Sequence, residues 1–228
     1  MYIASNDTSG SKRKRVPIKS SEISASNSDE FLLLQEMAHR INNELTSTIG
    51  IISCTVEHSH SHDVKVELTK VIEHLYDHAR TYRALQMPSA DRLIDAAAYL
   101  RELCQSISRA KLRHSGIELV LIDHPLQLSS WQCWRLGLIV SELITNASRH
   151  AFIDVGGTIR VELMKLGSNA ECRVTDDGTG PEHVRPGQGL RIIQQLARGL
   201  NGKIDQRFGR GGAAAIVSFP IEQPAQGD

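Results

Sequence analysis

Two stretches of apolar residues in the first ninety positions recur at alternating steps of three and four residues. The first comprises Phe31, Leu34, Ala38, Ile41, Leu45, Thr48 and Ile52. The second comprises Leu68, Val71, Leu75, His78, Tyr82 and Leu85. Such steps are typical of a coiled-coil seam, and Met87-Pro88 ends the second stretch. The pattern predicts a helical hairpin over residues 29–88, with Ser28 or Asp29 as the first N-cap.

One hairpin cannot bury the apolar faces of both of its helices, because a stable bundle usually needs four helices. We therefore predict a homodimer whose two hairpins form an antiparallel four-helix bundle. Residues 1–28 are rich in Ser, Asn, Asp and Lys and bury too little apolar surface to offset the entropy of ordering. We expect this segment to be a disordered tail, with a second short tail over residues 223–228.

Beyond Pro88 the pattern changes to helices that alternate with short strands. Helices are predicted over residues 91–109, 130–152 and 190–200. Strands are predicted over residues 117–122, 126–128, 158–163, 170–175, 203–207 and 213–219. Helices that accompany a mostly antiparallel sheet give an α+β fold, here a two-layer sandwich. We assign this second domain to residues 89–222.

Composition excludes several functional classes. The 228 residues carry 26 Lys plus Arg and 26 Asp plus Glu, so the basic excess of a nucleic-acid-binding protein is missing. No apolar run approaches the roughly 18–20 residues of a membrane span, and the first 28 residues lack a secretory signal. We expect no nucleic-acid binding, no membrane insertion and a cytoplasmic location. Four widely spaced cysteines fit reduced, mostly buried thiols: Cys54, Cys104, Cys133 and Cys172.

A histidine-rich segment joins the two predicted helices of the hairpin. His58, His60 and His62 alternate with serines, and alternating histidines could bind a divalent metal. A polar connection between two helices is the simpler interpretation.

The first candidate for chemistry is His39. It follows the seam residue Ala38, so its imidazole is expected at the edge of the seam, where it faces water. Asn43 lies one turn further along and shares that face. A largely neutral imidazole keeps a nucleophilic lone pair on one ring nitrogen, so His39 could carry a transferable group.

The predicted helix over residues 130–152 carries a polar stripe opposite its apolar face. The stripe consists of Glu142, Asn146, Arg149 and His150. Because the opposite face is apolar, with Leu138, Ile139 and Leu143, this stripe is expected to line a pocket. An amide oxygen and phosphate oxygens are hard ligands that suit Mg²⁺.

Two glycine-rich clusters follow in the chain. The first, Asp176-Asp177-Gly178-Thr179-Gly180, comes directly after a predicted strand. The second, Gly187-Gln188-Gly189-Leu190, comes directly before a predicted helix. Glycines permit a close backbone approach, and a helix N-terminus offers free N–H groups to a phosphate.

The order of these motifs resembles the HRxxN-type, HWE-related sensor histidine kinases of two-component systems, whose ATP-binding half belongs to the GHKL (Bergerat) superfamily. Residues 39–43 are similar to the phosphoacceptor motif of that family, and residues 142–152 to its N box. Residues 176–180 and 187–190 are similar to its two glycine boxes. Gly211-Gly212 before the last strand, which ends at Phe219-Pro220, also fits. The resemblance covers about residues 30–220.

The resemblance implies a site for ATP and Mg²⁺. Asp176 would accept a hydrogen bond from the adenine amino group, Asn146 would hold the Mg²⁺, and Glu142 would lie near the metal and its waters. Arg149 and His150 would reach phosphate oxygens. The loop over the nucleotide would be framed by Gly178, Gly180, Gly187 and Gly189, with Leu190 following.

The resemblance also implies the reaction. His39 would attack the γ-phosphate of ATP, and the phosphoryl group would pass to an aspartate in the receiver domain of a response regulator. Arg40 stands where many histidine kinases have an acidic residue, so Glu36 or Asn43 would have to fix the imidazole tautomer; Asn43 is favoured, and the general base stays open. The signal would come from a separate sensor protein or act directly on the bundle.

Two other functions are compatible with part of the sequence. A non-catalytic phosphotransfer or scaffold protein would keep the bundle and a vestigial ATP-binding fold. A GHKL serine kinase or anti-sigma factor would not explain the heptad hairpin that carries His39. The intact Asn146, Asp176 and glycine clusters favour the histidine kinase.

Overall fold

The computed structural model describes residues 20–112, 115–152, 156–179, 188–209 and 211–222. The chain divides into two compact units, residues 1–37 and 38–228. Two long helices come first, α1 (Ser20–His58) and α2 (His62–Ala84). The sandwich contains the helices α3 (Ala96–Ile107), α4 (Ser130–His150) and α5 (Gln188–Gly199), with a π-helical turn η1 (Ser108–Leu112) after α3. Its strands are β1 (Leu93–Asp95), β2 (Ile117–Ile122), β3 (Gln127–Ser129), β4 (Gly157–Leu166), β5 (Asn169–Asp176), β6 (Lys203–Gly209) and β7 (Gly212–Pro220).

Helix α1 starts earlier than its sequence pattern predicts. It begins at Ser20, so the proposed cap at Ser28 or Asp29 is wrong, and residues 20–28 are helical instead of disordered. The physical reason is the absence of a helix breaker, since neither glycine nor proline occurs between Pro17 and Gly50. Residues 1–19 and 223–228, where the tails are expected, lie outside the described residues.

The hairpin presents two neighbouring apolar faces. On α1, Ile49 is buried and Leu45, Ile52 and Val56 are half-buried. Three members of the predicted seams lie on the second face instead: Ile41 and Val71 are each 43% exposed, and Tyr82 is 52% exposed. Leu45 and Ile52 belong to the predicted seam, so the seam is confirmed in part, although Ile49 and not Thr48 is the buried residue between them. A second apolar stripe of the hairpin stays uncovered.

The C-terminal end of α2 is held by side chains of the sandwich. The Tyr99 hydroxyl donates a hydrogen bond to the carbonyl of Ala84 (2.9 Å), and the Trp134 indole N–H donates one to the carbonyl of Leu85 (3.0 Å). These carbonyls have no partner within their own helix, as at every helix C-terminus. Gly137 of α4 makes room for Tyr99, because a Cβ at this position would overlap the Tyr99 hydroxyl. Burial raises the pKa of Tyr99 well above that of a free tyrosine.

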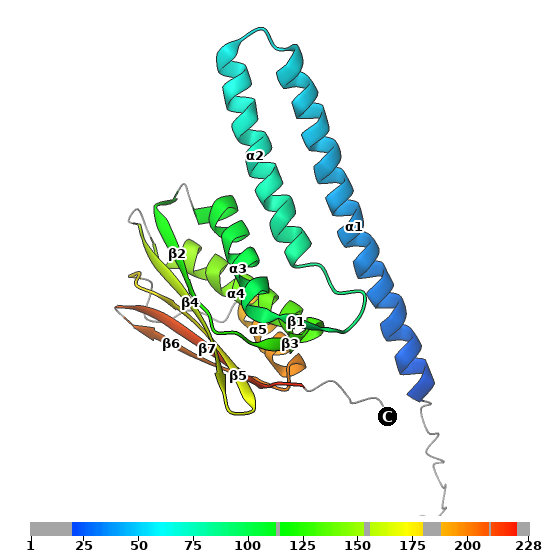
Figure 1. Cartoon of the computed structure of the whole chain (residues 1–228), viewed down its shortest axis with the longest axis vertical. Helices are drawn as coiled ribbons and strands as arrows, with labels where there is room; N and C mark the ends of the chain where they lie inside the picture. The colour runs from blue at the N-terminus through cyan, green and yellow to red at the C-terminus, as the bar shows by residue number, and fades with distance from the viewer. Residues whose placement is uncertain (1–19, 113–114, 153–155, 180–187, 210, 223–228) are drawn as a thin grey trace, which may run out of the picture. The chain divides into compact units, whose positions relative to one another are not determined.

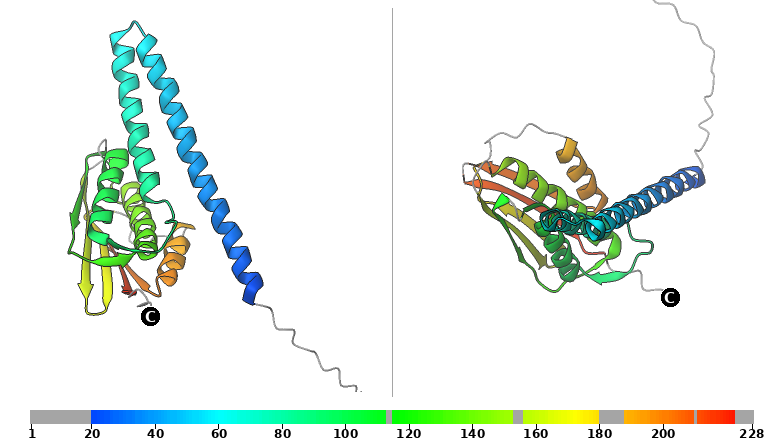
Figure 2. Two further views of the ribbon diagram at one scale, coloured as in Figure 1. Left: turned by 45° about the vertical axis from the view of Figure 1, so that its right-hand side comes forward. Right: turned by 90° about the horizontal axis from the view of Figure 1, so that it is seen from above.

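The sandwich is built on a five-stranded sheet in the order β2-β4-β5-β7-β6. Strands β2 and β4 are parallel and the other neighbours are antiparallel, which confirms the predicted mostly antiparallel sheet. Helices α3, α4 and α5 cover one face of this sheet (Figures 1 and 2). The core between the layers is made chiefly of aliphatic side chains, among them Leu100, Leu136, Ile139, Ile144, Ile159, Leu163 and Ile193.

The segment before α3 is the main error in the predicted helices. Residues 91–95 were expected to be helical, whereas Leu93–Asp95 forms β1 and pairs with β3. Asp95 is the N-cap of α3, and its carboxylate accepts hydrogen bonds from the backbone N–H groups of Ala97 (2.9 Å) and Ala98 (3.2 Å). An N-cap residue has an extended backbone, so the helix cannot begin before it.

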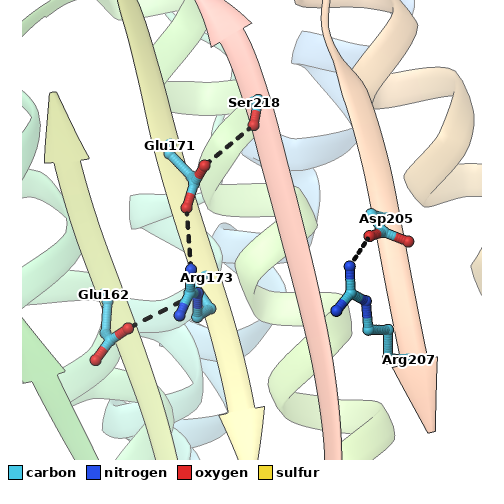
Figure 3. A network of polar contacts seen from close by, with 6 residues as sticks. All are labelled: Glu162, Glu171, Arg173, Asp205, Arg207 and Ser218. Carbon is cyan, nitrogen blue, oxygen red and sulfur yellow. Dashed lines mark hydrogen bonds and ion pairs between the residues drawn. The ribbon is translucent and has the colours of Figure 1, made fainter. Parts of the chain in front are cut away.

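The opposite face of the sheet is polar (Figure 3). Arg173 on β5 lies 3.4 Å from Glu171 and 4.0 Å from Glu162 on β4, and Glu171 also accepts a hydrogen bond from Ser218 on β7. These side chains are partly buried, and their polar groups pair with one another on the face of the sheet that the helices do not cover.

The cysteines and the histidine-rich segment largely match their predictions. All four cysteines are free thiols; Cys104, Cys133 and Cys172 are buried and Cys54 is exposed. Burial raises the pKa of Cys104 and of Cys133 to about 12. Residues 59–61 connect α1 to α2, with Ser61 as the N-cap of α2. In the described ranges, no group of three or more His, Cys, Asp or Glu side chains is arranged to hold a metal ion.

Among the described helices, none combines the length and the apolar character that crossing a bilayer requires.

Candidate functional site

A pocket of about 200 Å³ opens between the sheet and helices α4 and α5. Its walls are largely apolar, and its polar groups are few. The apolar lining includes Leu143, Ala147, Val174, Ile193 and Ala215. The polar lining comes from Asn146, His150, Asp176 and Gln206. An apolar pocket with a small number of placed polar groups is the usual form of a small-molecule site.

Asp176, at the end of β5, is the carboxylate of this pocket. Its Oδ1 accepts hydrogen bonds from the backbone N–H groups of Gly178 (3.1 Å) and Ala213 (3.2 Å). No described residue donates a hydrogen bond to its Oδ2, so this oxygen is available to a ligand. Burial raises the pKa of Asp176 above the usual 3.8, the two backbone hydrogen bonds oppose that change, and the neighbouring Asp177 carboxylate adds to it.

The adjacent Asp177 has a different task. Its Oδ1 accepts a hydrogen bond from the backbone N–H of Thr158 on β4 (2.7 Å), and Asp177 does not line the pocket. Of the two neighbouring aspartates, only Asp176 can therefore meet a ligand there.

Two glycines allow the backbone to close around Asp176. A Cβ at Gly178 would overlap the carbonyl of Ala151 at the end of α4. Gly212 has a φ of +118°, which side chains rarely adopt, and a Cβ there would overlap the carbonyl of Asp176. The ends of β5 and α4 and the start of β7 meet here because both positions lack a side chain.

The polar stripe of α4 divides at the pocket. Asn146 and His150 line the pocket, whereas Glu142 and Arg149 do not. Glu142 instead lies against the start of α5, since a Cβ at Gly189 would overlap its Oε1. Gly189 and Leu190 both line the pocket, while Gly180 and Gly187 lie outside the described residues.

These residues fit a Mg²⁺ ion that accompanies a phosphate. The amide of Asn146 and the carboxylate of Glu142 both lie next to Gly189. Both side chains carry an oxygen of the kind that Mg²⁺ prefers as a ligand.

Lys111 is a residue of this region that sequence reasoning missed. It lies in η1, and its Nζ donates a hydrogen bond to the hydroxyl of Thr145 on α4 (3.1 Å). Nothing in the local pattern distinguishes it from a surface lysine. Its place beside α4 depends on how η1 packs, which is a property of the whole fold.

His39 is exposed on α1, as its position beside the predicted seam indicates. The Nδ2 of Asn43 lies 3.2 Å from the Nδ1 of His39, so the predicted sharing of one helix face is confirmed. One ring nitrogen is therefore engaged by Asn43. In the described part of the chain, Nε2 has no hydrogen-bonding partner and can meet a reactant.

Comparison with known proteins finds one matching family for the hairpin and another for the sandwich. The family described as "Histidine kinase-like ATPase domain" matches residues 94–213, and the family described as "Histidine kinase" matches residues 36–111. The first match includes all but two of the residues that line the pocket, and the second includes His39 and Asn43.

Two curated relatives come from Erythrobacter litoralis. Its blue-light-activated histidine kinase 2 is 27% identical over 205 residues, which are 83% of this chain and 57% of the relative. Its blue-light-activated histidine kinase 1 is 25% identical over 197 residues, which are 83% of this chain and 53% of the relative. The chain thus spans a little over half the length of these two proteins.

A solved structure supports the fold. The histidine kinase domain of a blue-light activated histidine kinase from Erythrobacter litoralis superposes with a TM-score of 0.56 at 21% identity, covering 78% of this chain and 96% of that domain. The predicted α+β architecture, a helical hairpin followed by an ATP-binding sandwich, is confirmed. With a matching family over the hairpin and another over the sandwich, the chain belongs to the histidine kinases.

Proposed function

We propose that this protein transfers the γ-phosphoryl group of ATP to His39 and then to an aspartate in the receiver domain of a response regulator. The observation that carries the proposal is the pocket, whose lining lies almost entirely within the histidine kinase-like ATPase match and includes a carboxylate held by two backbone amides. The exposed His39, within the second family match, supplies the acceptor.

The pocket can distinguish adenine from guanine. In this proposal the Oδ2 of Asp176 accepts a hydrogen bond from the adenine amino group, while the base lies among the apolar side chains. Guanine has a carbonyl oxygen at that position, which would face the carboxylate and repel it. The preference for ATP over GTP therefore rests on one acceptor that is fixed in place.

The phosphates would lie toward the start of α5. A helix N-terminus attracts phosphate through its free N–H groups, and His150 and Arg149 add cationic or hydrogen-bonding groups from α4. Asn146 and Glu142 would hold Mg²⁺. When bound, this ion supplies positive charge that offsets the charge of the phosphates during transfer.

The hydrogen bond to Asn43 bears on which nitrogen of His39 attacks. Nε2 can attack only if its lone pair is free, and the single proton of the neutral ring then lies on Nδ1. With Nδ2 toward Nδ1, the Asn43 amide donates to Nδ1, and the ring proton would lie on Nε2. A half-turn of the amide exchanges Nδ2 and Oδ1, so that Oδ1 accepts a hydrogen bond from Nδ1–H. As Nε2 forms a bond to the γ-phosphorus, the bond to the leaving oxygen of ADP breaks. The ring then bears a positive charge, which Asn43 stabilises until the Nδ1 proton is lost to water.

This mechanism needs no base before the attack, because a neutral imidazole already has a lone pair. We infer that the missing acidic residue at Arg40 is compensated by Asn43, which fixes the tautomer. Asn43 is a positioning residue in this account, since it acts through His39.

Replacing Asn43 with alanine is expected to slow phosphorylation of His39 by about a hundredfold, the lower end of a typical acid–base contribution. The reason is that Nδ1–H loses its acceptor and the unproductive tautomer becomes populated. The rate of label incorporation from γ-labelled ATP measures the effect.

Asn43→Asp is the informative companion to that variant, because an aspartate oxygen also accepts from Nδ1–H. It should restore most of the rate and move the pH profile, since a carboxylate beside an imidazole raises the imidazole pKa. Equal rates in the alanine variant and the unmodified chain would contradict the role given to Asn43.

The full chain incubated with γ-labelled ATP and Mg²⁺ tests the proposed function. We expect a label that is stable in alkali and released by acid, as a phosphoramidate is, and that moves to a purified receiver domain. Nucleotide binding without any label would favour a scaffold or phosphotransfer protein. An acid-stable, alkali-labile label would favour a serine kinase.

We also propose that the protein is a homodimer. The uncovered stripe on the hairpin supports this, because apolar residues at heptad positions seek a partner helix. Its members include Ile41, Ile51, Val64, Val71 and Tyr82, each at least 43% exposed. A second hairpin related by a two-fold axis would cover the same stripe on both chains.

The substitution Val71→Lys is expected to weaken dimerisation by at least about a hundredfold. A two-fold interface would bury the new lysine twice, and a buried unpaired charge is costly. Sedimentation over a range of concentrations measures the dissociation constant.

Glu73→Lys is the matched control, because Glu73 is an exposed charged residue of the same helix that lies outside the stripe. It should leave the dissociation constant nearly unchanged. If both variants dimerise as the unmodified chain does, the stripe is not the interface.

A further inference from the structure

The turn η1 brings a lysine to the helix that carries the polar stripe. Lys111 extends from η1 to α4, where its Nζ lies 3.1 Å from the Thr145 hydroxyl. Thr145 directly precedes Asn146, which lines the pocket. Single π-helical turns occur often at functional sites; this one directly follows α3 and contains Lys111.

Lys111 belongs to a cluster of three charged side chains. Glu142, Thr145 and Arg149 follow one another on α4 at steps of three and four residues, so they share one face. Although Lys111 stays accessible to water, partial burial lowers its pKa, as does the charge of Arg149, while Glu142 opposes the change. Lys111 therefore lies within electrostatic reach of both.

The cluster has more positive than negative charge. Across the described ranges, no ion pair joins Lys111 or Arg149 to a carboxylate, and Glu142 is the one carboxylate whose charge acts on Lys111. Two cations that lie close together repel each other, and an anion between them would relieve the repulsion. The cluster is therefore suited to an anion.

The position of the cluster relative to the pocket indicates which anion. Glu142 lies against Gly189 at the start of α5, whereas Asp176 lies at the end of β5. If the base occupies the side of the pocket at Asp176, a phosphate chain directed toward the start of α5 approaches Lys111 and Arg149.

We propose that Lys111 binds the terminal phosphates of the nucleotide, with its ammonium group leaving the Thr145 hydroxyl for a β- or γ-phosphate oxygen. This inference rests on the proposed function only in taking ATP as the ligand. It assigns Lys111 to the binding of the phosphate chain, separately from the residues that recognise the base.

Binding of a nucleotide series to the full chain tests this inference. The affinities of ATP, ADP, AMP and adenosine are measured by calorimetry with Mg²⁺ in a His39→Gln background, which prevents transfer. Lys111→Gln is expected to weaken ATP about tenfold, the size of one charge-assisted hydrogen bond, and to leave AMP and adenosine within about twofold. Lys111→Arg should retain most of the ATP affinity.

Two controls separate the possible roles of Lys111. Lys165→Gln removes an exposed lysine of β4 and should leave every affinity unchanged. Thr145→Val removes the hydroxyl but keeps the lysine, so ATP should still bind. An equal loss for ATP and adenosine in Lys111→Gln would show a merely structural role and overturn the inference, as would an unchanged ATP affinity.

The outcome is independent of phosphoryl transfer. If a chain with His39 intact binds ATP but never becomes labelled, the proposed function fails while the assignment of Lys111 still stands or falls on the nucleotide series.

Discussion

Replacing His39 with glutamine is expected to abolish phosphoryl incorporation completely. Glutamine can still hydrogen-bond to Asn43 through its amide, yet it has no nucleophilic lone pair on nitrogen, so no covalent bond to phosphorus can form. Because His39 is exposed on α1, the substitution should leave the fold and the affinity for ATP intact. Label incorporation and ATP binding, measured on the same preparation, check both parts.

His62→Gln is the matched control, since His62 is another exposed histidine of the same hairpin. It should be labelled at the rate of the unmodified chain. Labelling that persists in His39→Gln would place the acceptor elsewhere and remove the basis of the proposed mechanism.

The parts of the fold that follow from local pattern were predicted well. Strand β2 occupies residues 117–122 as expected, and α4 begins at Ser130 as expected. The contact between His39 and Asn43 follows from helix periodicity alone, because residues four apart share a face. Each of these depends on neighbours in sequence.

The parts that depend on distant partners were missed. Strand β1 exists because it pairs with β3, and the position of Lys111 depends on how η1 packs against α4. The face of α1 that is buried within one chain matches the predicted seam only in part, since the pattern of two adjacent apolar faces does not say which one closes the hairpin. A sequence read locally contains no information on such pairings.

The pair Asp176 and Asp177 illustrates the same limit at the site. Both are short acidic residues at the end of one strand, and only the resemblance to a family singled out Asp176. The structure supplies the physical reason, because Thr158 on a neighbouring strand engages Asp177 while Asp176 lines the pocket. Their contacts therefore predict a large loss of ATP affinity when Asp176 is changed to asparagine and little change when Asp177 is.

Asp176→Asn is expected to weaken ATP binding by about a hundredfold, which corresponds to about 3 kcal/mol. Oδ1 can keep its two backbone hydrogen bonds, so the amide nitrogen must replace Oδ2. A donor would then face the donating amino group of adenine. Calorimetry with ATP and GTP measures the loss, and the preference for ATP should fall with it.

Asp177→Asn is the control for that substitution, because its Oδ1 can still accept from Thr158 and it does not face the pocket. ATP affinity should stay within about twofold, while the free energy of unfolding falls by at most about 1 kcal/mol.

The pH dependence of ATP binding gives an independent check on Asp176. Since burial raises the pKa of Asp176, the unmodified chain should lose its advantage over Asp176→Asn as acidification protonates the carboxylate, beginning above the pH at which an ordinary aspartate titrates. An advantage that persists unchanged below that pH would mean that Asp176 does not act as the acceptor.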